Sequence, residues 1–444
     1  MRKRIVLTTF GSLGDLHPYI AIALGLKDRG HDAIIATSRV YQEKIERAGL
    51  CFRSVRPDLP TAEETQEIVR RVMDPRRGPA YLFKRLLLPA LRDSYEDLMA
   101  ATDDADLLVA HMITLAAPLV AEKRSLRWVS SALQPSIFLS ASDPPAFAGL
   151  PWLAAVYRLG TGATRAVLGF GRAVQSAWLA PVRRFRRELG LPAIRASDLD
   201  MQVSPFLHLA LFSHVIGTPQ PDWPRETRQT GFCFYDRLED TELKVAPRAR
   251  SKLRADRGLS PEIDTFLKDG RPPLVFTLGS SAVMNPGSFF RVSIEAAGEA
   301  GERALLLVGV DPGNLMSQRL PDTILAAPYA PYSEVFGRSA AIIHQGGVGT
   351  TGQALRAGRP QLVVPFAYDQ PDNAARVARI GAALVLELRR YTPERAANAL
   401  RSLLDNPAYN ERAVEIGRDI RQEDGVRAAC DAIEEQLGAG GMAP

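Results

Sequence analysis

Glycines crowd one short segment whose residue types suit anion binding. Residues 344–351 read HQGGVGTT, with three glycines in four consecutive positions. An apolar strand is expected just before this segment, at 341–343, and a helix just after it. A glycine-rich turn from strand to helix directs free backbone N–H groups and the positive end of the helix at one point. The segment therefore predicts a phosphate-binding turn.

Polar side chains follow the next apolar strand, which we expect at 361–364. Residues 365–373 read PFAYDQPDN. Ligands of open α/β sheets bind at the carboxyl ends of the strands, so both segments should lie at the same edge of one parallel sheet. There, Asp369 and Gln370 are polar groups suited to holding the hydroxyls of a sugar.

Strand and helix patterns alternate in two runs separated by an irregular middle, which predicts an α/β protein with two doubly wound, Rossmann-like sheets. The turn-rich segment 217–224, a short strand at 230–234 and a charged stretch ending near Lys268 mark the boundary. We expect a first domain at 1–235, a second at 236–419, and a C-terminal helix at about 420–437 that returns to the first domain. The expected strands are 5–10, 33–37, 107–110, 127–130, 273–278, 304–310, 323–326, 341–343, 361–364 and 384–386.

Composition narrows the class of protein. The 444 residues carry a net charge of only +5, which argues against nucleic-acid binding. Cys51, Cys233 and Cys430 are far apart, so neither a disulfide framework nor a zinc site is indicated. We see no secretory signal and no apolar run long enough for a membrane span, so a cytoplasmic protein is expected.

Apolar residues and arginines are mixed between about Ala148 and Gly190, which predicts one or two amphipathic helices. Two interpretations remain open. The helices either pack on the sheet with their arginines in water, or form a hydrophobic wall for a small molecule with a basic rim that meets a membrane surface.

The segment 329–373 resembles the donor-binding signature of family 1 glycosyltransferases. Residues 11–18, GSLGDLHP, resemble the first loop of the same family, so the resemblance covers nearly the whole chain. It implies the GT-B fold, in which two domains face each other across a cleft, and inversion at the anomeric carbon without a metal. The form of the motif is most similar to the bacterial branch that glycosylates sterols, rhamnolipid precursors, antibiotic aglycones and flavonoids.

The resemblance also assigns donor-binding positions in the second domain. They comprise an aromatic ring that stacks on the base, groups that bind the diphosphate, and groups that bind the sugar hydroxyls. In that order they are Tyr329; Ser280, Ser281, His344, Gly347, Val348, Gly349 and Thr350; and Asp369 and Gln370. Gln353 replaces the glutamate that many relatives use for the ribose hydroxyls. Because an amide is a weaker acceptor than a carboxylate, either a UDP-sugar or a dTDP-sugar fits as donor.

Two residues of the first loop compete for the role of catalytic base. Many relatives have a histidine where this chain has Asp15, and an aspartate where it has Met112. Branches with an aspartate in this loop favour Asp15, whose low pKa requires that proton transfer come late in the reaction. His17 is the rival because an unperturbed histidine titrates near neutral pH. If Pro18 opens the helix, His17 would be its N-cap. His111 and the substrate itself are further alternatives.

The acceptor pocket should come from the first domain. Gln134, Phe138, His111 and Met112 are its candidate residues, and the apolar run 147–152 suggests a hydrophobic polyphenol, polyketide or lipid. We expect no metal or other cofactor, and a monomer or weak dimer. The competing functions are a nucleotide-sugar epimerase and a catalytically inactive nucleotide-sugar-binding protein. A hydride-transferring dehydrogenase is disfavoured because the first loop lacks GxGxxG.

Overall fold

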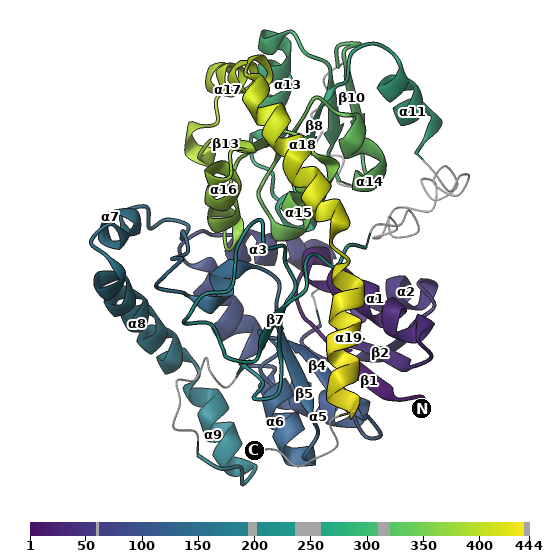
Figure 1. Ribbon diagram of the computed structural model, residues 1–444, viewed down its shortest axis with the longest axis vertical. Coiled ribbons are helices and arrows are strands. Elements are labelled where there is room, and N and C mark those ends of the chain that lie inside the picture. The colour runs from purple at the N-terminus through teal and green to yellow at the C-terminus, as the bar shows by residue number, and fades with distance from the viewer. Residues whose placement is uncertain (59–61, 194–201, 236–258, 310–319, 439–444) are drawn as a thin grey trace. The chain divides into compact units, whose positions relative to one another are not determined.

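A computed structural model describes residues 1–58, 62–193, 202–235, 259–309 and 320–438 (Figure 1). The chain forms two compact units. The first contains Met1–Tyr235 and Glu423–Pro444, and the second contains Asp236–Gln422. Most of the charged stretch expected at the boundary lies outside the described residues. No helix of the described ranges is long and apolar enough to cross a membrane.

A seven-stranded parallel sheet forms the centre of the first unit, in the order β3-β2-β1-β4-β5-β6-β7. The chain therefore reverses direction across the sheet between β1 and β4, which is a topological switch point. Strand β7 replaces the strand expected at 230–234, and the sequence patterns missed β3 and β6. The strands are β1 Arg4–Thr8, β2 Asp32–Thr37, β3 Cys51–Ser54, β4 Leu107–His111, β5 Trp128–Ala132, β6 His208–Ala210 and β7 Thr227–Gln229.

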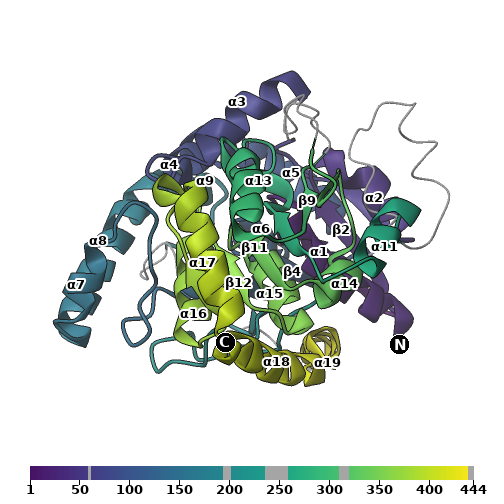
Figure 2. The same cartoon turned by 90° about the horizontal axis from the view of Figure 1, so that it is seen from above.

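Helices flank this sheet, and α7 and α8 lie at the outer edge of the unit, away from the strands (Figures 1 and 2). The helices are α1 Leu13–Asp28, α2 Gln42–Arg47, α3 Ala62–Val72, α4 Gly78–Tyr81, α5 Leu91–Ala101, α6 Ala117–Arg124, α7 Leu153–Tyr157, α8 Thr161–Trp178, α9 Ala180–Glu188 and α19 Gly425–Gly438. Three shorter helical segments are η1 Arg39–Tyr41, the π-helical η2 Leu82–Leu87 and the 3₁₀ segment η3 Pro135–Phe138.

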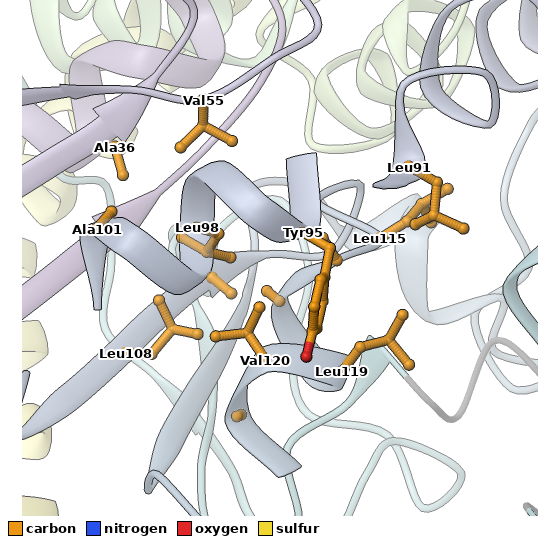
Figure 3. Packing of buried hydrophobic residues seen from close by; sticks show 14 of the residues in the cluster. Ala36, Val55, Leu91, Tyr95, Leu98, Ala101, Leu108, Leu115, Leu119 and Val120 are labelled. Carbon is orange, nitrogen blue, oxygen red and sulfur yellow. The ribbon is translucent and has the colours of Figure 1, made fainter. Parts of the chain in front are cut away.

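A buried apolar core lies between α5, α6 and the sheet (Figure 3). Tyr95 and Leu98 of α5 pack with Val120 of α6 and Leu108 of β4. These contacts fix the central strands, and the loops at their carboxyl ends, in one arrangement.

The last helix, α19, packs against α1. The guanidinium of Arg29 donates to Asp431 and to Glu434, each at 2.6 Å. Gly25 allows the two helices to approach closely, since a Cβ there would lie 2.9 Å from both Cys430 Sγ and Val426 Cγ1.

The second unit contains a six-stranded parallel sheet in the order β10-β9-β8-β11-β12-β13. Its switch point lies between β8 and β11, so the loops after these two strands are neighbours. The strands are β8 Leu274–Thr277, β9 Ala304–Leu307, β10 Ile324–Ala327, β11 Ala341–His344, β12 Gln361–Val363 and β13 Ala383–Val385. The helices are α11 Pro261–Lys268, α12 Gly279–Ala282, α13 Phe289–Ala300, α14 Tyr332–Val335, α15 Val348–Ala357, α16 Gln370–Arg379, α17 Pro393–Asp405 and α18 Pro407–Gln422, with 3₁₀ turns η7 Phe336–Arg338 and η8 Leu388–Arg390. The prediction of two doubly wound sheets is confirmed.

Candidate active site

The glycine turn connects β11 to α15 as expected, with Gly347 as the N-cap of the helix. Gly346 has φ of +87°, and a Cβ there would lie 2.8 Å from Val363 Cγ1 and 3.0 Å from the carbonyl oxygen of Gln370. Only glycine fits this position without strain. The turn therefore holds the start of α15 tightly against the loop that follows β12.

That second loop is fixed by its own polar side chains. The Asp369 carboxylate accepts from the Val348 N–H at 3.1 Å and from Asn373 Nδ2 at 2.6 Å. Gln370 Oε1 accepts from the backbone N–H groups of Phe366 and Ala367. The structure thus places Asp369 directly at the first residue of α15, beside the glycine turn, as the common sheet edge predicted.

His344 has a different role from the predicted one. Its ring is fully buried, Nδ1 accepts from the Gly346 N–H at 3.0 Å, and Nε2 lies 2.8 Å from Gln361 Oε1. Burial lowers the pKa of His344 to about 4, so the ring is neutral at pH 7. Both nitrogens are used inside the protein. In this structure the ring braces the turn, and its donation to a diphosphate stays a prediction.

Gln345 lies between Gly279 and the glycine turn, and it was not singled out from the sequence. A Cβ on Gly279 would lie 2.4 Å from Gln345 Nε2, and a Cβ on Gly347 would lie 2.8 Å from the same atom. The carboxamide thus occupies the space between the loop after β8 and the glycine turn. Its Oε1 is buried and has no hydrogen-bond partner among the described residues. Successive side chains of a strand point in opposite directions, so residues 344 and 345 should face different sides of the sheet. This alternation was the sequence signal that could have identified Gln345.

Other donor positions gather around this amide. Thr350 Oγ1 would be 3.4 Å from a Cβ on Gly279, and the half-buried Ser280 and Ser281 follow directly in α12. Gln353 lies further along α15 and is almost fully buried. Tyr329 lies apart from this group, half-buried after the outer strand β10.

In the first unit, Asp15 belongs to the N-terminal cap of α1. Its Oδ2 accepts from the Ser12 N–H at 2.7 Å and from Ser12 Oγ at 3.0 Å, which completes a capping box. Oδ1 accepts no hydrogen bond from the described residues. The half-buried carboxyl therefore has one oxygen held in place and one available at the carboxyl end of β1.

His17 is not the N-cap of α1, because the helix begins at Leu13 with Ser12 as its cap and includes Pro18. Pro18 lies in the second turn, where its missing N–H removes one intrahelical hydrogen bond, that to the Gly14 carbonyl. The His17 ring meets the edge of Tyr235 at 5.4 Å. Burial and the nearby charge of Lys44 lower the pKa of His17 to about 3. Its supposed advantage as a base near neutral pH is therefore absent.

The four predicted acceptor residues separate into two groups. Phe138 is buried and stacks on Trp223 at 4.1 Å between ring centres, and its contact with an acceptor stays a prediction. His111 is also buried, and burial lowers its pKa while the charge of Asp15 opposes this shift. Met112 and Gln134 are half-buried at the carboxyl ends of β4 and β5, and both stay predictions.

In the described ranges, no three His, Cys, Asp or Glu side chains lie close enough together to hold a metal ion. The polar groups at the two sheet edges are instead amides, hydroxyls, backbone N–H groups and single carboxylates.

Comparison with solved structures places this architecture among glycosyltransferases of the GT-B fold. The calicheamicin glycosyltransferase CalG4 superposes over 100% of both chains with a TM-score of 0.69 and 18% identity. The glycosyltransferase VinC, in complex with dTDP, covers 98% of this chain and all of its own, with a TM-score of 0.67 and 20% identity.

Sequence comparison agrees in both halves. Residues 5–98 match the N-terminal domain of glycosyltransferase family 28, and residues 305–426 match the C-terminal domain of proteins like erythromycin biosynthesis protein CIII. O-mycaminosyltylonolide 6-deoxyallosyltransferase of Streptomyces fradiae is 33% identical over 442 residues, 97% of each chain. A sterol 3-beta-glucosyltransferase of Cryptococcus neoformans is 29% identical over 98% of this chain, which spans 27% of that enzyme. The chain belongs to the family 1 glycosyltransferases.

His17, His208 and His344 should stay neutral well below pH 6. Burial lowers the pKa of His17 and of His208 to about 3, and that of His344 to about 4. We expect their imidazole signals, in protein labelled at its six histidines, to stay constant from pH 8 to pH 5. Single His→Gln variants assign the signals, and a midpoint near 6.5 for any of the three would contradict the burial argument. Because the unfolded chain binds these protons and the folded chain does not, the free energy of unfolding should fall as the pH drops below about 6.5.

Proposed function

We propose that this glycosyltransferase moves a hexose or deoxyhexose from a dTDP- or UDP-sugar to a hydroxyl of a hydrophobic small molecule. A polyketide is our first choice of acceptor, ahead of a sterol or polyphenol. The observation that carries the proposal is the grouping of Gln345, Thr350 and Asp369 around the start of α15. The similarity to a deoxyallosyltransferase that, by its name, acts on a tylonolide supports the choice of acceptor and of a deoxysugar.

The reaction we propose is a single displacement. The acceptor oxygen bonds to the anomeric carbon while the bond from that carbon to the diphosphate breaks, so the configuration inverts. Oδ1 of Asp15 accepts the proton of the acceptor hydroxyl late in the step. By then the attacking oxygen is partly bonded to the sugar carbon and holds its proton only weakly. The negative charge on the leaving diphosphate is stabilised by the N-terminus of α15 and by hydrogen bonds from Thr350 and Gln345. These groups carry the charge without a metal.

Nucleotide-sugar epimerisation and an inactive binding protein are the alternatives. Neither is favoured by the similarity to named transferases over the full chain. Each would release or retain the nucleotide without a new glycoside.

The direct test is transfer by the purified chain. We expect a glycoside, detected by mass, when dTDP-glucose, dTDP-rhamnose or UDP-glucose is combined with a macrolactone, a sterol or a flavonoid in the presence of EDTA. The coupling constant of the anomeric proton then reports inversion. Donor consumption or donor binding without a glycoside across the panel would contradict the proposal.

Replacement of the candidate base tests the proton transfer. Asp15→Asn keeps an oxygen that accepts from Ser12, so the cap of α1 is retained while the proton acceptor is lost. We expect kcat to fall by about 10²–10⁴-fold with little change in the thermal midpoint. Asp28→Asn, at the exposed far end of the same helix, is the matched control and should keep full activity. A kcat within threefold of wild type in Asp15→Asn would exclude this base.

The role of Gln345 is tested by nucleotide affinity. A hydrogen bond to a charged group contributes about 1.5–3 kcal/mol, so Gln345→Ala should weaken dTDP binding by roughly ten- to a hundredfold in calorimetry. Gln345→Glu should weaken it further, because a carboxylate would face the diphosphate. Gln422→Ala, on the exposed end of α18, serves as the control. Unchanged dTDP affinity in Gln345→Ala would remove this residue from the donor site.

A further inference from the structure

Exposed apolar side chains concentrate on one part of the first unit. Leu150, Trp152, Leu159, Phe170 and Val174 are exposed, and Trp152, Leu159 and Phe170 are 56%, 77% and 71% accessible. Within the described ranges, the other exposed large apolar side chains are only Met1, Val385 and Leu388. We call the surface formed by these five residues of α7, α8 and the adjoining loops the outer apolar face.

The outer apolar face follows the geometry of α8. Thr164 and Leu168 of this helix are buried, whereas Phe170 and Val174 point outward together with small residues. These exposed small residues are Gly162, Ala166, Gly169, Ala173 and Ala177. A helix on the surface of a soluble domain usually turns its polar side outward. Here the outward side is apolar, and α7 and α8 stand at the edge of the unit in both views (Figures 1 and 2).

Positive charge surrounds this face. From Pro144 to Arg187 the sequence has seven arginines and no Asp or Glu. Four of them, Arg158, Arg165, Arg184 and Arg187, are exposed. The half-buried Arg172 and Arg183 donate to backbone carbonyl groups, and Arg186 is buried beside Glu122.

Neighbouring elements add further cations. The aliphatic part of Arg76 lies against Gly149, where a Cβ would be 3.0 Å from Arg76 Cγ. Lys84 of η2 lies 5.1 Å above the Trp178 ring. The nearby acids are already engaged: Asp74 accepts from the backbone of Arg76 and Arg77, Glu122 pairs with Arg186, and Glu188 pairs with Arg92 and Arg184.

An open groove continues the outer apolar face between η2 and α8. Its volume is about 750 Å³, and Leu88, Pro89, Val174 and Trp178 form much of its wall, with Lys84 as its charged lining residue. An apolar groove with a cation in its lining suits an alkyl chain that ends in an anionic group.

We propose that the outer apolar face binds the surface of an anionic lipid bilayer. Apolar side chains enter the boundary of the headgroups while arginine and lysine pair with lipid phosphates. Tryptophan such as Trp152 favours this interface. A second copy of the chain fits less well, because a twofold contact would bring the same arginines opposite one another. The inference is independent of the proposed donor and acceptor.

Vesicle binding by the full chain tests the inference. We expect co-sedimentation with phosphatidylcholine vesicles that contain 30% phosphatidylglycerol, none with pure phosphatidylcholine, and loss of binding at 0.5 M salt. Phe170→Asp and Leu159→Asp should each weaken binding at least tenfold, and their unchanged circular dichroism would show that they fold. Leu388→Asp, an exposed apolar position in the second unit, is the control and should bind as wild type does.

Three results would overturn the inference. One is the absence of binding to the anionic vesicles. Another is equal binding to both kinds of vesicle, which would remove the role of charge. The third is a dimer in sedimentation velocity that Phe170→Asp dissociates, without vesicle binding, which would assign this face to a contact between copies.

Discussion

Both units depend on one constraint, the side-by-side pairing of strands that are distant in sequence. Strand β1 pairs with β4, and β8 pairs with β11, in parallel. Each pairing creates a topological switch point at the carboxyl edge of its sheet. There the chain segments that follow the two strands leave on opposite sides of the sheet. The segments that follow β1 and β8, which include Asp15 and Gly279, both start there. Without this pairing, the Asp15 carboxylate would not lie beside the segment that follows β4, and the glycine turn would not lie beside the segment that follows β8.

Much of this arrangement was predictable, because strand patterns and glycine turns are local signals. The segment HQGGVGTT predicted a strand, a turn and a helix, and the structure has β11, Gly346 and α15 in that order. The strands β3 and β6 were missed; β3, with the sequence CFRS, lacks the apolar run that marked the predicted strands.

Side-chain direction was the harder part. His344 was assigned from the family resemblance, and nothing in the sequence indicated that its ring would bond to Gln361 or that the Gln345 amide would lie between Gly279 and Gly347. Phe138 resembles a residue of an apolar pocket, yet Trp223, 85 positions later in the sequence, covers its ring. Burial and the charge of Lys44 lower the pKa of His17, and neither can be read from the first loop alone. These features depend on contacts between segments that are separated in the sequence.

The capping box at Ser12 and Asp15 also has a consequence for the orientation of the carboxylate. The carboxylate that would receive a proton is the same group that holds the first turn of α1. Both the N–H and the hydroxyl of Ser12 donate to Oδ2, so the carboxyl group has little freedom to rotate. The direction of Oδ1 is therefore set by the first turn of α1, and a change at Ser12 would alter the orientation of Asp15 without replacing it.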